Sequence, residues 1–203
     1  MEVADAFMRC NVEQAARRGC RRGDIAGLSL AGRIGGMSSP TDRQILPFTL
    51  RAAEPRDVSA IVGLIEELAA FEDLTHLLAL TADTLHPHLF GPKPLVEALV
   101  GEVGGHVVAF ALYFTNFSTF LAKPGLYLED LYVQPAYRSS GLGTGLLTRL
   151  AEIAVERDYG RFEWSVLDWN ADAIRFYEKM GANVMPEWRI CRLSGAALAA
   201  YKI

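Results

Sequence analysis

Apolar and polar positions follow two periods along residues 48–203, and together these periods predict an α/β chain. Short runs rich in β-branched, aromatic and leucine residues predict strands over 48–53, 95–103, 106–114, 127–133, 162–167 and 187–193. Apolar residues spaced by three or four predict helices that begin near residues 58, 82, 141, 170 and 194. We expect Asp57 and Thr81 to cap the first two helices. Gly104 and Gly105 predict a tight hairpin between two of the strands.

Residues 1–46 differ from this pattern. Arginines alternate there with glycine and alanine, and long periodic apolar runs are missing. Because such a segment would bury little apolar surface, we expect a disordered or poorly packed extension over 1–46, followed by one domain over 47–203.

The composition bounds the class of protein. The chain has 203 residues, of which 51% are hydrophobic, and a net charge of −4. One compact domain with a proper core is expected. The absence of a basic block argues against a nucleic-acid partner, and no apolar run is long enough to span a membrane. Three cysteines without metal spacing suit a reducing cytoplasm, and His86 and His88 lack a zinc spacing, so we expect no metal.

The most informative stretch is the strand at 127–133 together with the glycine-rich turn that follows it. Gly141, Gly143 and Gly145 stand where the next helix begins, although glycine inside a helix is unfavourable by about 1 kcal/mol relative to alanine. Where side chains are absent, the free N–H groups of a first helical turn can close on a phosphate. Arg138 precedes the turn and can add a charged contact. The alternative is a turn whose glycines only permit tight packing.

Two other phosphate-binding loops fit this turn poorly. A P-loop needs a lysine followed by serine or threonine after its spacer, and no such lysine is present. A dinucleotide fingerprint needs a third glycine where Leu146 stands, on a turn directly after the strand. Several residues, including Pro135, intervene here.

Residues 138–143, Arg-Ser-Ser-Gly-Leu-Gly, resemble the Arg/Gln-x-x-Gly-x-Gly/Ala signature of the GCN5-related N-acetyltransferases, which bind acetyl-coenzyme A. Other segments resemble the diamine branch of that family, the spermidine/spermine and thialysine N-acetyltransferases. They are Leu-Glu-Asp-Leu-Tyr-Val at 128–133, Asp-Trp-Asn at 168–170, Phe-Tyr-Glu-Lys-Met-Gly-Ala at 176–182 and Glu-Trp-Arg at 187–189. The resemblance extends from about Phe48 to the C-terminus.

This resemblance implies an α/β fold with a mixed, mostly antiparallel twisted sheet of six to seven strands and about four flanking helices. Two central strands splay apart in that fold, and the pantetheine arm lies in the gap. The resemblance also implies a small-molecule amine as acceptor, and a homodimer with the end strand near the partner.

Direct acetyl transfer requires a neutral amine and a protonated leaving thiolate. Because an alkyl amine has a pKa of about 10, it arrives mostly as an ammonium ion. Glu129 is the candidate for binding this ammonium and acting as general base; the alternative is a structural carboxylate paired with a cation. In the family a tyrosine at the position of Tyr177 is the proton donor; the alternative is a core aromatic residue beside Phe176.

The resemblance implies further site residues. Contacts to acetyl-coenzyme A are expected from Leu131, Tyr132, Val133, Arg138, Ser139, Ser140, Gly141, Leu142, Gly143, Thr144, Asn170, Ala173 and Tyr177. Asn170 could equally be a helix N-cap. Contacts to the amine are expected from Phe71, Glu72, Glu129, Asp130, Trp169 and Trp188.

The acceptor is less constrained. Thr75 and His76 stand where the animal polyamine enzymes carry further acidic residues, which favours short diamines, ornithine or thialysine-like amino acids, or tyramine over spermine. A loop at 116–123 with Phe117 and Phe120 could cover the acceptor pocket or only pack on the sheet. Two other functions stay open: a protein N-terminal or lysine acetyltransferase, and a non-catalytic acyl-coenzyme A sensor.

Overall fold

The computed structural model describes residues 47–202, so the extension predicted over 1–46 lies outside the described residues. Five strands form one sheet in the order β1-β2-β3-β4-β5. The first four are antiparallel to their neighbours, and β5 is parallel to β4. They are β1 (Phe48–Ala52), β2 (Glu97–Val103), β3 (His106–Ser118), β4 (Lys123–Val133) and β5 (Phe162–Trp164).

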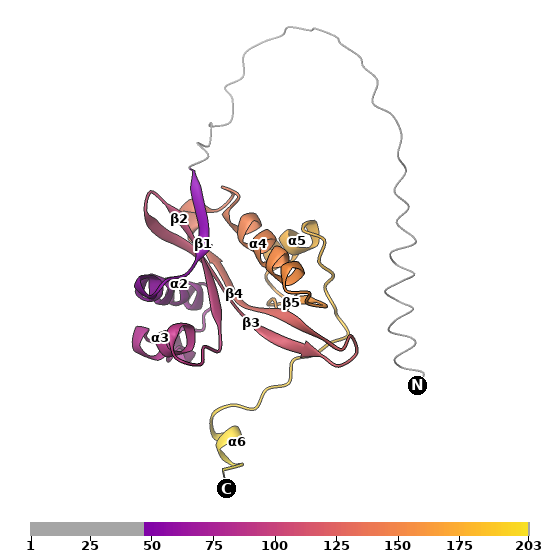
Figure 1. The fold of residues 1–203 in the computed structure, drawn as a ribbon. Coiled ribbons are helices and arrows are strands. Elements are labelled where there is room, and N and C mark those ends of the chain that lie inside the picture. Colours follow the sequence, from indigo (N-terminus) through magenta and orange to yellow (C-terminus); the bar gives the residue numbers. More distant parts are fainter. Residues whose placement is uncertain (1–46, 203) are drawn as a thin grey trace, which may run out of the picture.

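Helices cover both faces of the sheet (Figure 1). On one face lie α2 (Val58–Phe71) and α3 (Ala82–Phe90), and on the other lie α4 (Leu142–Glu156) and α5 (Ala171–Lys179). A short α6 (Gly195–Ala199) follows near the C-terminus, and 3-10 turns occur at η1 (Pro55–Asp57), η2 (Thr75–Leu77) and η3 (Pro135–Tyr137). Within the described residues, no helix combines the length and apolarity that a membrane crossing needs.

Two hydrophobic clusters hold these layers together. One joins α4 to the sheet and includes Leu126, Leu128 and Leu146, which are almost fully buried. The other joins α2 and α3 to the opposite face and includes Ile61 and Phe110. Because β3 contributes to both clusters, its central residues 108–113 are buried without alternation, as expected for a strand covered on both sides.

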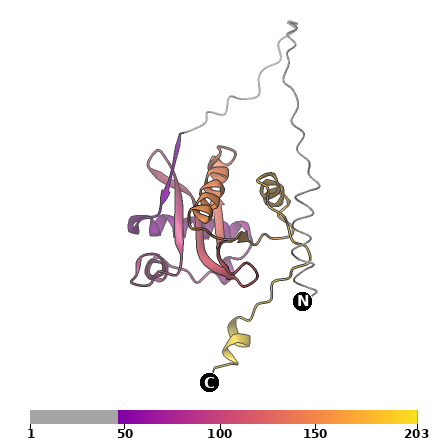
Figure 2. The same cartoon turned by 45° about the vertical axis from the view of Figure 1, so that its right-hand side comes forward.

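The sheet has fewer strands than the six to seven predicted, because residues 187–193 do not form a strand. The segment after α5 runs away from the sheet toward α6 (Figures 1 and 2). Its apolar residues Val184, Met185, Trp188, Ile190 and Leu193 are between 45% and 70% exposed. A strand needs a hydrogen-bonding partner, and in the part of the chain that the structure describes this segment pairs with none, since the edge strand β5 is only three residues long and pairs with β4 alone.

The aromatic loop predicted over 116–123 is largely strand. β3 extends to Ser118 and β4 begins at Lys123, so only residues 119–122 form the turn. This turn precedes Glu129 by at least seven residues of extended chain, a span of about 20 Å. The structure therefore places it at the far end of the β3–β4 hairpin from the glycine turn.

The two predicted caps have different outcomes. Thr81 caps α3, because its hydroxyl accepts the Thr84 N–H at 3.2 Å. Asp57 does not cap α2 with its side chain. It instead accepts two hydrogen bonds from Arg51, at 2.6 and 2.9 Å, and one from the N–H of Glu54 at 2.7 Å. These bonds lower the pKa of Asp57, and the carboxylate ties β1 to η1.

Candidate active site

The glycine turn presents a row of unused backbone N–H groups. Within the described residues, no acceptor is bonded to the amides of 139–144, whereas Gly145 N–H donates to Gly141 O at 2.8 Å. Ser139 and Gly141 have φ of 64° and 96°, a left-handed backbone in which neighbouring N–H groups can converge on an anion. α4 starts directly afterwards and adds the positive end of its dipole. The turn therefore fits a phosphate group.

Gly145 serves a different purpose from the one predicted. A Cβ at this position would lie 2.8 Å from Leu50 Cδ1 and 3.5 Å from Phe48 Cε2. Its missing side chain therefore lets α4 press on β1, and its N–H is already used in the helix. Of the three glycines, only Gly141 and Gly143 belong to the part of the glycine turn with free N–H groups.

A β-bulge decides which backbone groups of β4 face the gap between β4 and β5. Asp130 pairs with Leu112 whereas Leu128 pairs with Tyr113, so Glu129 is the extra residue. Before the bulge, the Leu126 N–H donates across to Arg161 O on the β5 side. After it, the Gln134 N–H donates to Val108 O on the β3 side. By alternation, the N–H groups of Leu131 and Val133 then point away from β3, toward the gap.

The gap itself is where β4 and β5 separate. Their parallel pairing covers only Leu126–Leu128 opposite Phe162–Trp164. Beyond it, residues 129–133 of β4 have no strand beside them on that edge among the described residues. The splayed central strands expected from the sequence are therefore present, and the gap leads to the glycine turn.

Three carboxylates meet beside the bulge. Asp130 is half-buried, and burial together with the nearby charges of Glu129 and Glu72 raises its pKa to about 6. Burial also raises the pKa of Glu72, the C-cap residue of α2. Glu129 is exposed. No cation neutralises Asp130 within the described residues, so this group suits a positively charged ligand.

Tyr177 lies on α5 against the end of β5. Its ring is 5.1 Å from the ring of Trp164 and 5.4 Å from that of Phe176. Burial raises the pKa of the phenol, and the charge of Glu72 raises it further. Tyr177 therefore lies close enough to Glu72 to interact with it electrostatically. Trp164 is not among the predicted site residues, although its place within the predicted strand over 162–167, beside the gap, could have indicated it.

Aromatic side chains border the carboxylates on the α2 side. Phe71 ends α2, and its ring centroid is 6.1 Å from that of Trp169. Both rings are about half exposed, at 47% and 56%. The predicted amine contacts Phe71, Glu72, Glu129, Asp130 and Trp169 are thus brought together, whereas Trp188 lies in the C-terminal segment and is 66% exposed. The expected strand that would have carried Trp188 does not form in this chain.

The side chains of several predicted cofactor contacts are buried or already engaged within the protein. Leu142 is buried in the α4 core, and Tyr132 is buried on the α2 side with its hydroxyl donating to Glu67 at 3.1 Å. Asn170 is the N-cap of α5, because its Oδ1 accepts the Ala173 N–H at 3.2 Å. This bond occupies the Ala173 amide. Ser140 donates from Oγ to Tyr137 O at 2.6 Å, which shapes the turn.

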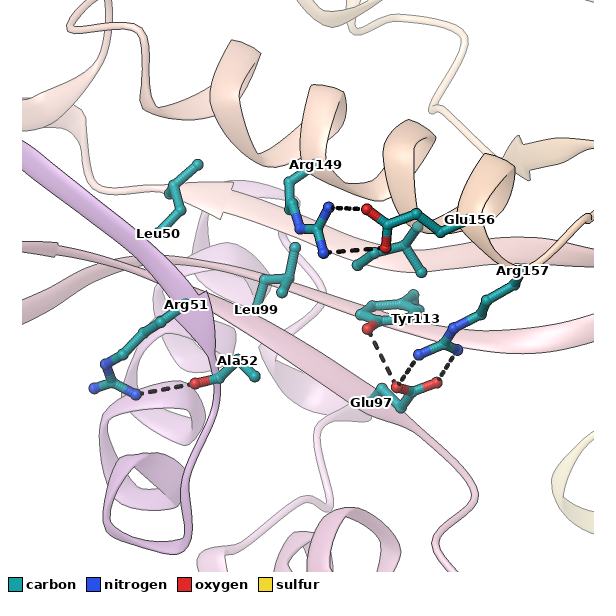
Figure 3. Close-up of a pocket in the computed structure, with 10 residues that line it drawn as sticks. Leu50, Arg51, Ala52, Glu97, Leu99, Tyr113, Arg149, Glu156 and Arg157 are labelled. Carbon is teal, nitrogen blue, oxygen red and sulfur yellow. Dashed lines mark hydrogen bonds and ion pairs between the residues drawn. The ribbon is translucent and has the colours of Figure 1, made fainter.

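A separate hollow of about 250 Å³ lies between α4 and strands β1 to β3 (Figure 3). Arg157 donates to both carboxylate oxygens of Glu97, at 2.5 and 2.7 Å, and Arg149 donates to both of Glu156, at 2.7 and 3.3 Å. Tyr113 also donates to Glu97. These charges neutralise one another in pairs, and none of the predicted site residues lines the hollow. We interpret it as an ion-paired seam between helix and sheet.

No group of three or more histidine, cysteine, aspartate or glutamate side chains in residues 47–202 is arranged to hold a metal ion. The carboxylates beside the bulge are acceptors for a cationic ligand, and the free amides of the turn are donors for an anionic one. The two halves of the site thus carry opposite polarity and share the gap between β4 and β5.

The fold and this site define an acetyltransferase. A model of the acetyltransferase (GNAT) family matches residues 64–182, more than half of the chain. The chain belongs to this family, whose members use acetyl-coenzyme A as co-substrate.

Relatives of known activity agree with this family. The chain is 36% identical to an L-ornithine N5-acetyltransferase, NATA1, of Arabidopsis thaliana over 208 aligned positions, covering 80% of this chain and 91% of that protein. It is 35% identical to a thialysine N-ε-acetyltransferase of Mus musculus, covering 73% and 94%. Among solved structures, an integron cassette protein from Vibrio cholerae matches with a TM-score of 0.64 at 24% identity, over 75% of this chain and 96% of that one, which supports the fold.

Proposed function

We propose that this protein transfers an acetyl group from acetyl-coenzyme A directly to the primary amine of a small cationic acceptor. The observation that carries this proposal is the juxtaposition of two unsatisfied sites: the free amides of 139–144 and the carboxylates around Asp130, joined by one gap. The relatives that act on ornithine and thialysine support a short diamine or a diamino acid as acceptor. Tyramine and longer polyamines are the next acceptors to test.

The chain's own residues would hold the coenzyme through its backbone. The N–H groups of 139–144 would bind the diphosphate, with Arg138 beside them. The N–H groups of Leu131 and Val133 would align the pantetheine arm and polarise the carbonyl. When bound, the coenzyme supplies the acetyl thioester that the amine attacks.

Tyr177 is the proposed proton donor. Because burial raises its pKa, the phenol stays protonated at neutral pH and can give its proton to the leaving sulfur. Its contacts with Trp164 and Phe176 fix the ring against the end of β5, so that the donor is held in one position.

The carboxylates divide the remaining work. The sequence analysis assigned both ammonium binding and the base to Glu129. Glu129 is exposed, whereas Asp130 is half-buried with a pKa raised to about 6. A base with a pKa near the working pH accepts a proton and releases it again most readily. We therefore propose Glu129 for binding the ammonium ion together with Glu72, and Asp130 for removing its proton, directly or through water.

An amine panel tests this function. Purified protein is given acetyl-coenzyme A with ornithine, thialysine, 1,3-diaminopropane, spermidine, tyramine and a lysine-containing peptide, and free thiol is followed. We expect the fastest release of thiol with ornithine, thialysine or the diamine. Turnover only with the peptide would support the protein acetyltransferase instead. Binding of acetyl-coenzyme A without turnover on any amine would support the sensor.

Replacing Gly143 by valine should weaken coenzyme A binding by about 10- to 100-fold, which corresponds to about 1.4–2.8 kcal/mol, because the branched side chain would occupy space beside the free amides of 139–144. A Cβ here would lie 3.8 Å from Phe176 and 3.9 Å from Val133, so a valine would enter the space between β4 and α5. Calorimetric titration with coenzyme A measures the change. Gly63→Val is the control, because Gly63 is also inside a helix and a Cβ there meets nothing within 4 Å. Equal affinity of both variants would contradict the placement of the diphosphate.

We also propose that the protein is a cytoplasmic homodimer in which the C-terminal segment of one copy covers the other. The segment after α5 exposes the apolar residues Trp188, Ile190 and Leu193 and points away from its own sheet (Figure 2). Such a surface on a monomer favours association. The exposed thiol of Cys191 and the odd number of cysteines suit a reducing compartment.

Replacing Ile190 by aspartate should shift the protein from dimer to monomer. Loss of a buried isoleucine corresponds to about 1.5–3 kcal/mol, which weakens the dimer by at least tenfold. Sedimentation velocity over a concentration series measures the shift. Val155→Asp is the matched control, because Val155 is 80% exposed on α4 and lies outside the segment. A wild type that is monomeric at every concentration would exclude the dimer.

A further inference from the structure

The side chain of Arg138 connects the glycine turn with the end of α2. Its Nε donates to Val133 O at 3.0 Å, which anchors the guanidinium beside the end of β4. The guanidinium carbon lies 5.3 Å from the ring centroid of Phe71 and 5.5 Å from that of Tyr132. No ion pair holds Arg138 within the described part of the chain. Arg138 also hydrogen-bonds Tyr132, but that partner is neutral, so the positive charge stays available to an anion while the guanidinium lies against aromatic rings.

Phe71 connects Arg138 with the predicted amine site. It is the last residue of α2, it is 47% exposed, and it precedes Glu72. Its ring contacts Arg138 and also contacts Trp169. Glu72 is the residue whose charge reaches both Asp130 and Tyr177. A change in the mobility of Phe71 therefore changes the position of Glu72 relative to Asp130 and Tyr177.

Glu67 makes a second connection, between α2 and the end of β4, in which Arg138 is not a partner. One turn before Phe71, Glu67 accepts hydrogen bonds from Tyr132 Oη at 3.1 Å and from Gln134 Nε2 at 2.7 Å. These two hydrogen bonds hold the last turns of α2 against the C-terminal end of β4. Beyond Glu67, Leu68 and Ala69 still pack in the core, whereas the exposed ring of Phe71 is held by its contacts with Arg138 and Trp169.

We propose that Arg138 is a positioning residue through which an occupied glycine turn orders the end of α2 and so assembles the amine site. This inference rests on the proposed function, because the occupant of the turn is taken to be the diphosphate of coenzyme A. A guanidinium can bind phosphate oxygens along its edge and stack on an aromatic ring with its face at the same time. A diphosphate that immobilises Arg138 gives the Phe71 ring a fixed guanidinium to pack against. Because Glu72 is the next residue, its carboxylate is then held in place as well.

The consequence is that coenzyme and amine bind cooperatively. When a first ligand orders a second site, the second ligand loses less conformational entropy on binding and therefore binds more tightly. Without bound coenzyme, an amine would meet an exposed Phe71 ring that an immobilised Arg138 does not yet hold in place. This coupling acts through the protein, in addition to the direct attack of the amine on the thioester.

Hydrogen exchange with a partial ligand tests this coupling. Adenosine 3′-phosphate 5′-diphosphate carries the diphosphate of coenzyme A but no pantetheine arm, so it cannot itself reach the amine site. Amide exchange is measured by mass spectrometry on the full chain with and without this nucleotide. We expect slower exchange in peptides covering 139–145 and also in a peptide covering 66–78. The slowing at 66–78 should be about two- to fivefold, the factor that an exposed cation–π contact corresponds to.

Two variants isolate the route. Phe71→Leu should keep the protection at 139–145 and lose it at 66–78. Arg138→Lys keeps the charge but lacks the planar face, and it should also lose protection at 66–78 at a nucleotide concentration that still saturates the turn. Phe117→Leu is the control, because Phe117 is 60% exposed on the β3–β4 hairpin, and it should behave as the wild type does.

The outcomes separate the two hypotheses. Protection at 139–145 without protection at 66–78 in the wild type overturns the coupling and leaves the coenzyme site intact. Protection at both segments in Phe71→Leu likewise overturns the route through this ring. No protection at 139–145 overturns the proposed coenzyme site, and the coupling with it.

Discussion

Replacing Tyr177 by phenylalanine should lower kcat by roughly 10²- to 10³-fold, the usual contribution of a positioned general acid. The substitution keeps the ring that packs on Trp164 and Phe176 and removes only the hydroxyl. Because the coenzyme is held by the backbone of 139–144 in this proposal, its affinity should change by less than about threefold. Steady-state kinetics with the best acceptor from the amine panel, and titration with coenzyme A, measure both quantities.

Tyr159→Phe is the matched control for this experiment. Tyr159 is also a partly buried tyrosine packed against the α4 core, and its hydroxyl is hydrogen-bonded to Thr115 at 2.8 Å. It lies beyond the end of α4, so loss of its hydroxyl should leave kcat unchanged. If Tyr177→Phe retained full kcat, Tyr177 would be a packing residue and the donor would have to be water or another group.

Replacing Asp130 by asparagine should stabilise the protein while it inactivates the enzyme. The folded pKa of Asp130 is about 6, against 3.8 for the free side chain, because burial and the charges of Glu129 and Glu72 oppose ionisation. Folding is therefore opposed by this carboxylate above pH 6. The difference of about two pKa units corresponds to at most about 3 kcal/mol. The gain in the variant should be largest above pH 6 and disappear below about pH 4, where both unfolded and folded wild type are protonated.

The loss of activity has the same origin. Protonated Asp130 cannot accept the proton of the ammonium ion, so kcat/KM of the wild type should fall as the pH drops below about 6. The asparagine variant should be strongly reduced at all pH values and lack this acidic limb. Chemical denaturation at a series of pH values and pH–rate profiles measure the two effects.

Asp73→Asn serves as the control for stability. Asp73 is exposed close to Glu72, and asparagine tolerates its left-handed backbone, with φ of 58°, equally well. Its free energy of unfolding should change by less than about 0.5 kcal/mol. A destabilised Asp130→Asn variant would show that the native carboxylate has a cationic partner and is no acceptor for the substrate.

Much of the fold could be predicted from the sequence because the signals are local. Five of the six strand predictions correspond to β1 to β5 within a few residues at each end, apart from the longer β3–β4 hairpin, and the helices begin close to the predicted residues. The glycine turn, its helix and the free N–H groups also follow from neighbouring residues, since glycine and proline restrict the backbone wherever they occur. Residues 187–193 illustrate the limit. Their pattern is typical of a strand, but a strand also needs an edge to pair with, and the pattern does not contain that partner.

The sequence by itself determined most of the helices and strands, the glycine turn and the residue types available for chemistry. The tertiary structure decided how those residues are used. The bulge at Glu129 turns the later backbone groups of β4 toward the gap, burial next to Glu72 raises the pKa of Asp130, and Arg138 meets Phe71 from another helix. Gly145 serves the contact with β1 for the same reason. Each of these depends on distances between segments far apart in the chain, and solvation and charge interactions respond to those distances rather than to sequence neighbours.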